Sequence, residues 1–331
     1  MKIALIGTGY WGPNIARNLL ALKQEITIYD INKSNLERTL QQYSNCIRAD
    51  SLEDVLNNTR IEAVAIAVPL IGHSALIIQS LKAGKHVFVE KSLCYSLDEA
   101  EAIKPLLGDR ILMVGHITLF TGSTFKIKEF IEEKHIGNLT GIYSTRTHLG
   151  KIYPGIDAAT EVSSHDISLF LYLLNEMPVS VSAYGASRLG LGEPDNVCII
   201  LRFRQNLTCT INVQWSSIIR ERKIVVEGNS GSLVCIRDRE KEELTFYDQR
   251  AAFKALRNGA YPSDATKLVR TQVLFNSNRE PLYDELGAFL ECIENSKQPL
   301  TDFFFGRKVV KVLESIRMSM CQNGKTVKIF E

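Results

Sequence analysis

The N-terminal segment, residues 1–30, constrains the fold more than any other part of this sequence. A short apolar run at residues 2–6 is typical of a strand buried in a parallel sheet. Residues 7–12 (GTGYWG) follow at once and fit the pattern G-x-G-x-x-G, and a helical pattern and a second apolar strand come next. Because all parts of a dinucleotide-binding βαβ unit occur in order, we predict a bound dinucleotide here rather than a simple glycine turn.

Each glycine of the motif has its own physical task, and so does the acid that ends the second strand. Gly7 permits the tight turn, Gly9 lets a pyrophosphate approach the backbone, and Gly12 lets the helix pack closely on the strand. The N-terminus of the helix offers free N–H groups to the phosphates. Asp30 can accept hydrogen bonds from both ribose hydroxyls and would repel a 2′-phosphate, which predicts NAD. Lys33 keeps NADP open as the second choice.

Three further apolar strands, at residues 61–68, 86–90 and 110–114, alternate with helical patterns. This alternation predicts an α/β fold with a doubly wound parallel sheet of the Rossmann type. In such sheets ligands bind at the carboxyl ends of the strands, where Pro69 and Lys91 lie. The predicted cofactor-binding residues are Gly7, Gly9, Tyr10, Trp11, Gly12, Asp30, Pro69, His73, Glu90 and Lys91.

Past residue 120 the pattern changes to short segments rich in β-branched and aromatic residues. The strand candidates are residues 139–148, 179–186, 196–204, 207–215, 223–227, 232–236 and 243–247. Turn sequences at 204–207 and 228–231 predict hairpins, so we expect an α+β domain with a large, mostly antiparallel open sheet. Residues 249–278 are polar and are predicted to form a loop or lid, followed by a helix at about 281–295.

These patterns predict two domains. Residues 1–120 would bind the cofactor, and residues 121–331 would bind the substrate and mediate oligomerisation. A broad open sheet needs its outer face covered, which predicts a homodimer or homotetramer.

Composition and charge exclude several classes of protein. With 331 residues and 45% hydrophobic content, the chain can form two cores. A net charge of +2 and a pI near 8.1 give no reason to expect a nucleic acid or membrane surface as partner. No apolar run reaches the roughly 18 residues that span a bilayer, and the first residues form a strand rather than a signal peptide, so we expect a cytoplasmic protein.

The cysteines and histidines do not form a recognisable metal or disulfide pattern. The seven cysteines are odd in number and scattered, without a C-x-x-C, which predicts small buried side chains rather than disulfides or a zinc site. The six histidines are not paired at ligand spacing, so we expect no metal.

A second candidate site lies in residues 160–168 (TEVSSHDIS), just before an apolar helical run. Ser163-x-x-Asp166 predicts a capping box, which would place His165 in the first helical turn. There the helix dipole favours the neutral imidazole, which can accept a proton. Glu161 shares a helix face with His165 only if the helix begins by Thr160; otherwise spacing does not set their distance. The alternative for any one histidine is a structural role.

Other candidates are single residues at strand ends. Lys91 could polarise a hydroxyl or carbonyl beside the cofactor and stabilise the alkoxide, although a lysine after a buried strand is usually only solvated. His73 and His116 are expected to shape the nicotinamide pocket or to cap strands. Arg146 either meets a substrate phosphate or is a solvated charge at a strand end.

Together the motifs resemble those of the Gfo/Idh/MocA oxidoreductases over nearly the whole chain. The matching motifs are the sequence GTGYWGPN at residues 7–14, Val68-Pro69 with His73, Glu90-Lys91, Gly115-His116, Ser164-His165-Asp166, residues 228–231 and residues 299–302. In that family the lysine of a Glu-Lys-Pro motif and a histidine preceded by an aspartate four residues earlier carry the chemistry. Lys91 and His165 match. Ser92 replaces the proline and Glu161 the aspartate, which puts the geometry of the site in doubt.

The resemblance implies an NAD(P)-dependent dehydrogenase or reductase that transfers a hydride between nicotinamide and a ring carbinol of a sugar, most closely a nucleotide-linked sugar. The catalytic residues would be Lys91, His165 and Glu161, with His165 taking the hydroxyl proton and Lys91 bound to the same oxygen. The substrate-binding residues would be Lys91, His116, Arg146, Asp166 and His165. Two alternatives stay open: an NAD-bound sensor or regulatory protein without net turnover, which Ser92 and Glu161 would favour, and a glycosidase that uses NAD in a closed redox cycle.

Overall fold

The computed structural model describes residues 1–150, 155–190, 192–238, 241–277 and 280–330. The chain divides into two compact units. One consists of residues 1–120 and 280–311, and the other of residues 121–279 and 312–331. Helix α11, Phe303–Cys321, contributes residues to both units.

The first unit contains a six-stranded, all-parallel sheet in the order β3-β2-β1-β4-β5-β6. Its strands are β1 Lys2–Ile6, β2 Glu25–Tyr29, β3 Ile47–Arg48, β4 Ala63–Ile66, β5 His86–Glu90 and β6 Leu112–Gly115. The predicted doubly wound parallel sheet is confirmed. Strand order reverses at β1 and β4, and the carboxyl ends of these two strands form the crevice where such sheets bind ligands.

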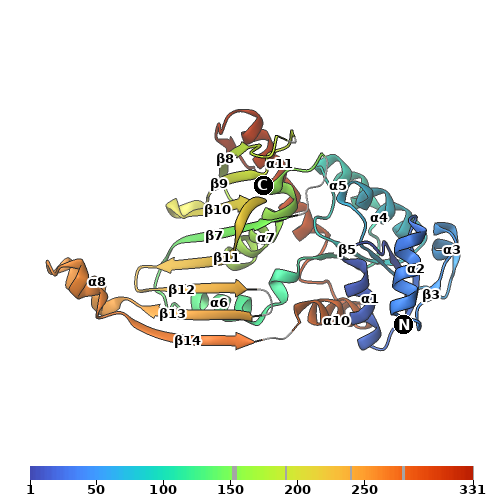
Figure 1. The fold of residues 1–331 in the computed structure, drawn as a ribbon, viewed down its shortest axis with the longest axis horizontal. Helices are drawn as coiled ribbons and strands as arrows, with labels where there is room; N and C mark the ends of the chain where they lie inside the picture. Colours follow the sequence, from blue (N-terminus) through green and yellow to red (C-terminus); the bar gives the residue numbers. More distant parts are fainter. Residues whose placement is uncertain (151–154, 191, 239–240, 278–279, 331) are drawn as a thin grey trace. The chain divides into compact units, whose positions relative to one another are not determined.

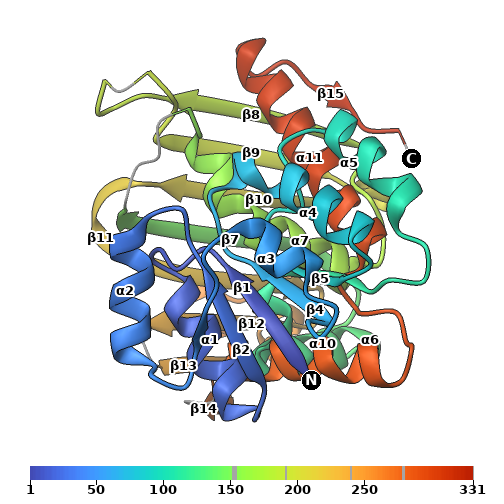
Figure 2. The same ribbon diagram turned by 90° about the vertical axis from the view of Figure 1, so that its right-hand side faces the viewer.

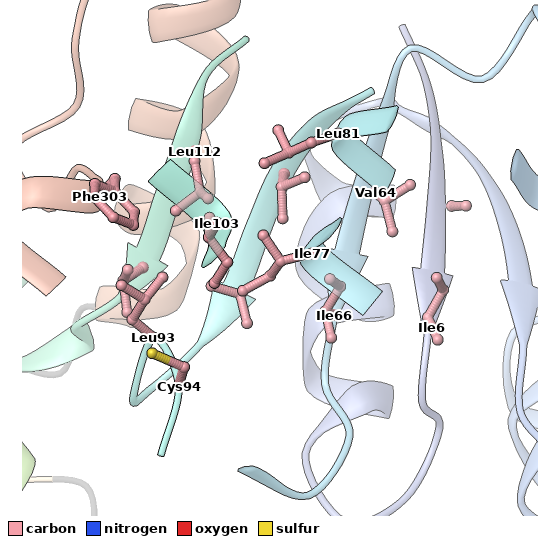
Figure 3. Close-up of a cluster of buried hydrophobic side chains, with 14 of the residues drawn as sticks. Ile6, Val64, Ile66, Ile77, Leu81, Leu93, Cys94, Ile103, Leu112 and Phe303 are labelled. Atoms are coloured by element: carbon pink, nitrogen blue, oxygen red, sulfur yellow. The ribbon is translucent and has the colours of Figure 1, made fainter. Parts of the chain in front are cut away.

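Helices cover both faces of this sheet (Figure 2). They are α1 Gly12–Ala21, α2 Lys33–Gln42, α3 Leu52–Asn57, α4 His73–Lys82, α5 Leu97–Ile103 and α10 Pro281–Glu294. Side chains point alternately to the two faces of a strand, and helices cover both faces here. Both faces of each central strand therefore carry apolar side chains. On one face Ile6 and Ile66 belong to the same buried cluster as Ile77 of α4 (Figure 3). On the other face Phe88 of β5 packs against Phe289 of α10, with ring centroids 5.8 Å apart.

The second unit contains a nine-stranded sheet in the order β14-β13-β12-β11-β7-β10-β9-β8-β15 (Figure 1). Its strands are β7 Leu139–Leu149, β8 Ser180–Ala186, β9 Asn196–Arg202, β10 Thr208–Gln214, β11 Ser216–Gly228, β12 Gly231–Asp238, β13 Lys241–Asp248, β14 Arg270–Ser277 and β15 Val327–Lys328. Only β7 and β10 pair in parallel; every other pairing among the described strands is antiparallel. The predicted mostly antiparallel sheet and both predicted hairpins, β9–β10 and β11–β12, are confirmed.

Helices α6 Gly122–Glu132 and α7 Ser164–Leu174 also belong to this unit. Along β7 the side chains of Ile142, Ser144 and Arg146 are buried, and Asp166 of α7 bonds to the last two of them. Tyr143, which points to the opposite face, is 38% exposed. The sheet therefore has a face covered by α7 and a second, more exposed face.

The prediction of a loop or lid at 249–278 is wrong. This segment forms helices α8 Arg250–Arg257 and α9 Pro262–Thr266 and then strand β14, which pairs with β13 at the edge of the sheet. An edge strand is held by main-chain hydrogen bonds to one neighbouring strand, so it can form without an alternating pattern of apolar residues. In β14, Thr271, Gln272 and Val273 are all exposed. None of the helices within the described ranges is long and apolar enough to cross a membrane.

Candidate active site

The glycine motif forms a tight turn between β1 and α1. Gly7 has a φ of +95°, and a Cβ there would lie 2.5 Å from the carbonyl oxygen of Ala67. A Cβ on Gly12 would lie only 2.1 Å from the carbonyl oxygen of Gly7. A Cβ on Gly9, by contrast, would meet no atom within 4 Å. Two of the glycines therefore close the turn, and the third leaves open space against the backbone, as a pyrophosphate requires.

Asp30 holds this turn from the end of β2. Its carboxylate accepts hydrogen bonds from the Thr8 backbone N–H at 2.6 Å and hydroxyl at 3.0 Å, and from the Asn32 N–H at 2.7 Å. Arg38 of α2 donates to the carbonyl oxygen of Thr8 at 3.3 Å. Lys33 was the cation that the sequence suggested for a 2′-phosphate, and Arg38, further along α2, was not predicted.

The surroundings of the turn fit a dinucleotide. Tyr10 is 83% and Ile31 is 90% exposed, and Ile71 after β4 is also exposed. These side chains follow the carboxyl ends of neighbouring strands and give this edge apolar surface that a base or ribose would cover. The indole nitrogen of Trp11 is buried, and no partner for it lies in the described part of the chain.

The segments after β4 and β5 are joined by His73. Its Nδ1 lies 2.7 Å from the carbonyl oxygen of Ser92, and its Nε2 lies 3.0 Å from that of Val68. His73 is 1% exposed, so it fixes the turn that follows Lys91 against the turn that contains Pro69. The Lys91–Ser92 peptide bond is cis, and the Lys91 N–H donates to the Glu90 carboxylate at 3.3 Å.

His116 lies at the carboxyl end of β6 and is completely buried. Its ring packs edge-on against Phe305, with centroids 5.7 Å apart. Burial, followed by the positive charge of Lys91, lowers the pKa of His116 to about 3. The imidazole is therefore neutral at physiological pH and does not titrate there.

Glu285, a buried acid beside this group, was not predicted from the sequence. Glu285 lies on α10 one turn before Phe289, which packs against Phe88, and Glu90 lies two residues after Phe88 on the same face of β5. Glu285 is 0% exposed, and neither carboxyl oxygen has a hydrogen-bond partner among the described residues. Burial, and then the charge of Glu90, raise the pKa of Glu285 well above its ordinary value of 4.5.

We expect Glu285→Gln to make the protein more stable than the wild type, by an amount that grows with pH. An acid whose pKa is raised on folding binds its proton more tightly in the native state. Between pH 4.5 and the raised pKa, wild-type stability therefore falls by about 1.4 kcal/mol per pH unit. Chemical unfolding at pH 5 and pH 8 measures this, with the exposed Glu291→Gln on the same helix as control. An equal difference between variant and wild type at both pH values would contradict it.

In the second unit, helical backbone begins earlier than predicted. Residues Ala159–Ser163 form a π-helical turn that runs directly into α7. The predicted capping box is wrong: Ser163 has helical backbone angles, and its hydroxyl donates to the carbonyl oxygen of Ala159 instead. The apolar residues before it are buried and continue the helix upstream, so Ser163 lies inside the helix rather than at its N-cap.

Glu161 and His165 lie on this continuous helical segment, separated by about one turn. Helical structure begins before Thr160, and this was the condition under which Glu161 and His165 share a helix face. Both side chains are half-buried. Asp157, which precedes this segment, holds its start: the Asp157 carboxylate accepts hydrogen bonds from the Thr160 N–H and hydroxyl.

Asp166 forms a buried ion pair with Arg146 of β7. Its carboxylate accepts from Nε of Arg146, at 2.8 and 2.7 Å to the two oxygens, and from the Ser144 hydroxyl at 2.6 Å. The side chains of Arg146 and Asp166 are 8% and 0% exposed. This pair ties the first turn of α7, and with it the backbone of His165, to strand β7.

The candidate residues thus form three groups, two in the first unit and one in the second. In the first unit the structure brings together the glycine turn with Asp30, and separately His73, Glu90, Lys91 and His116. In the second unit it brings together Glu161, His165, Asp166 and Arg146. Within the described ranges, no three His, Cys, Asp or Glu side chains are grouped so that they could hold a metal ion.

Comparison with known families now identifies the class of protein. Residues 1–116 match the family described as "Oxidoreductase family, NAD-binding Rossmann fold". Residues 125–234 match the "GFO/IDH/MocA C-terminal domain". The chain belongs to the Gfo/Idh/MocA family. Its membership confirms the predicted oxidoreductase class and the NAD(P) cofactor.

Individual relatives of this Gfo/Idh/MocA protein have several activities. UDP-N-acetylglucosamine 3-dehydrogenase of Acidithiobacillus ferrooxidans is 22% identical over 97% of both chains. A structure of that enzyme superposes with a TM-score of 0.83 at 20% identity, covering 98% of this chain and 99% of that one. Myo-inositol 2-dehydrogenase of Thermotoga maritima is 24% identical, over 72% of this chain and 76% of its own. The 2,7-anhydro-N-acetylneuraminate hydratase of Escherichia coli is 25% identical, over 70% of this chain and 67% of its own.

Proposed function

We propose that this protein is an NAD(P)-dependent dehydrogenase or reductase of a ring carbinol in a sugar or cyclitol, and that the sugar is nucleotide-linked. The observation that supports this most directly is the similarity to UDP-N-acetylglucosamine 3-dehydrogenase from end to end of both chains. A glycine turn with open space at Gly9 and an acid at Asp30 supports NAD as the preferred dinucleotide.

In the proposed reaction the substrate gives up a hydride to the cofactor and a proton to the protein. When bound, the nicotinamide accepts the hydride from the carbinol carbon. His165 takes the hydroxyl proton as general base, and Lys91 donates a hydrogen bond to the same oxygen and stabilises its developing negative charge. Glu161 orients the imidazole or tunes its basicity. The reverse reaction uses the same groups in the opposite sense.

The buried groups around these residues would position them. His73 holds the turn after Lys91, and the neutral His116 lies beside Lys91 without adding a second positive charge. The Asp166–Arg146 pair fixes the start of α7, which carries His165.

A redox-neutral reaction with retained NAD is the second candidate. It is favoured by one observation, the relative that is named a hydratase rather than a dehydrogenase. In such a cycle the hydride returns to the substrate, so product forms without net NADH.

Thermal stabilisation followed by an assay for NADH would test the proposal. We expect NAD to raise the melting temperature, and one member of a panel of UDP- and dTDP-sugars to raise it further, because ligands that bind only the native state stabilise it by mass action. That sugar should then yield NADH. Product without NADH would favour the redox-neutral alternative, and stabilisation without any turnover would favour a sensor. No shift with either dinucleotide, in protein from which bound cofactor had been extracted, would contradict the proposal.

We also propose a homodimer or homotetramer formed through the exposed face of the nine-stranded sheet. Apolar and aromatic side chains such as Tyr143 on β7 and Tyr184 on β8 are exposed there. Sedimentation of the wild type and of Tyr143→Glu would test this, since a monomeric wild type would exclude it.

A further inference from the structure

A groove with a volume of about 250 Å³ lies at one end of the nine-stranded sheet, within the second unit. Its walls are the β11–β12 hairpin at Gly228 and Asn229, the start of β7 at Thr140, and the start of α8 at Gln249 and Phe253. These three segments meet at the same end of the sheet (Figure 1). The main-chain N–H of Gln249 donates to a carbonyl oxygen of the hairpin at 3.0 Å, which holds the start of α8 against it.

The groove is separate from the residues that position His165. On β7, Arg146 follows Thr140 by six residues, which is about 20 Å along a strand. Arg146 is the residue that pairs with Asp166 in the first turn of α7. A ligand in the groove therefore lies at the opposite end of β7 from the Arg146–Asp166 pair.

Two amide side chains on the walls of the groove have unused donors. The side-chain oxygen of Asn229 accepts from the main-chain N–H of Asn138 at 3.0 Å, and because a main-chain N–H can only donate, the other end of this amide is its NH₂ group. The side-chain oxygen of Gln249 accepts from the Ser232 hydroxyl at 2.9 Å. Within the described ranges, neither NH₂ group donates a hydrogen bond.

The other lining residues supply an acceptor and an aromatic ring. Glu227, at the end of β11, is half-buried, and its carboxylate can only accept hydrogen bonds when ionised. Phe253 is also half-buried and is the only apolar side chain among the described residues that line the groove, apart from its glycine. No lysine or arginine is among these lining residues.

This combination matches a neutral ring that carries several hydroxyl groups. Such hydroxyls both donate to a carboxylate and accept from amide NH₂ groups, and the C–H face of the ring can pack on an aromatic side chain. An anion would meet the charge of Glu227 and find no cation, and a single carboxylate does not hold a metal ion. Since sites for drug-sized molecules have volumes of roughly 300–1,000 Å³, a groove of about 250 Å³ suits one ring.

We propose that this groove binds one neutral pyranose or cyclitol ring, at a second site that is separate from the reaction. Glu227 accepts hydrogen bonds from the ring hydroxyls, the NH₂ groups of Asn229 and Gln249 donate to them, and Phe253 covers one face of the ring. The proposal does not depend on which sugar the enzyme oxidises or on whether it oxidises one.

Calorimetric titration with methyl β-D-glucoside, myo-inositol and glucuronate tests this. The wild type should bind at least one of the two neutral rings in the millimolar range, and glucuronate at least tenfold more weakly, because Glu227 repels its carboxylate. Glu227→Gln should weaken binding of the neutral ring tenfold or more and abolish the discrimination against glucuronate. Gln249→Met, which removes an amide donor, should also weaken it. Glu243→Gln, an exposed glutamate on β13, is the matched control and should bind like the wild type.

Folding and turnover are checked separately. Both groove variants should keep the circular dichroism spectrum of the wild type and its stabilisation by NAD, since neither residue is predicted to bind the cofactor. Failure of both neutral rings to bind the wild type saturably, or equal affinity in Glu227→Gln, would overturn the groove proposal and leave the dehydrogenase proposal standing. If a ring binds through Glu227 but no sugar yields NADH, the groove proposal holds and the dehydrogenase proposal fails.

Discussion

His165→Ala should lower turnover by about a hundred- to ten-thousand-fold and leave the affinity for NAD unchanged. A positioned general base contributes about this factor to proton transfer. His165 is not among the residues predicted to bind the cofactor, so its removal should leave the affinity for NAD unchanged. Initial rates of NADH formation and calorimetric NAD binding measure the two effects.

The control for His165→Ala is His135→Ala. His135 is exposed, belongs to the same unit and pairs with Glu133 at 2.7 Å, so its loss should change neither quantity. Turnover of His165→Ala within about tenfold of the wild type would exclude it as the base. Loss of both turnover and NAD binding would instead assign it a structural role.

The fold of the first unit could be predicted because its determinants are local. Apolar runs bounded by glycine, proline or an acid mark the buried parallel strands, and the G-x-G-x-x-G turn fixes the first crossover. Strand β14 was not predicted for the opposite reason. Its residues are polar and exposed, and what makes it a strand is main-chain pairing with β13, more than twenty residues earlier in the chain.

The site shows the same division between local and tertiary determinants. Lys91 and His165 could be selected because each lies at the end or start of an element that the pattern reveals. Glu285 could not, since on an amphipathic helix a glutamate is usually exposed, and only the contact of Phe289 with Phe88 places it inside.

Asp166→Ala should destabilise the second unit by about 3–5 kcal/mol, the usual cost of leaving one member of a buried ion pair without its partner. The Arg146 side chain, which is 8% exposed in the wild type, would be left without its carboxylate partner. We expect the melting temperature of this unit to fall by on the order of 10 °C. The affinity of the first unit for NAD, measured below that transition, should stay the same.

A double replacement separates the effect of the pair from that of its surroundings. In Arg146→Met/Asp166→Leu both charges are gone and apolar side chains fill the space, so most of the lost stability should return, as it does when a buried ion pair is replaced rather than broken. Asp166→Asn, which keeps the shape but not the charge, should fall between the two. If Asp166→Ala melts within about 2 °C of the wild type, the Arg146–Asp166 pair does not hold α7 to β7. The position of His165 would then have to depend on the π-helical turn and Asp157 alone.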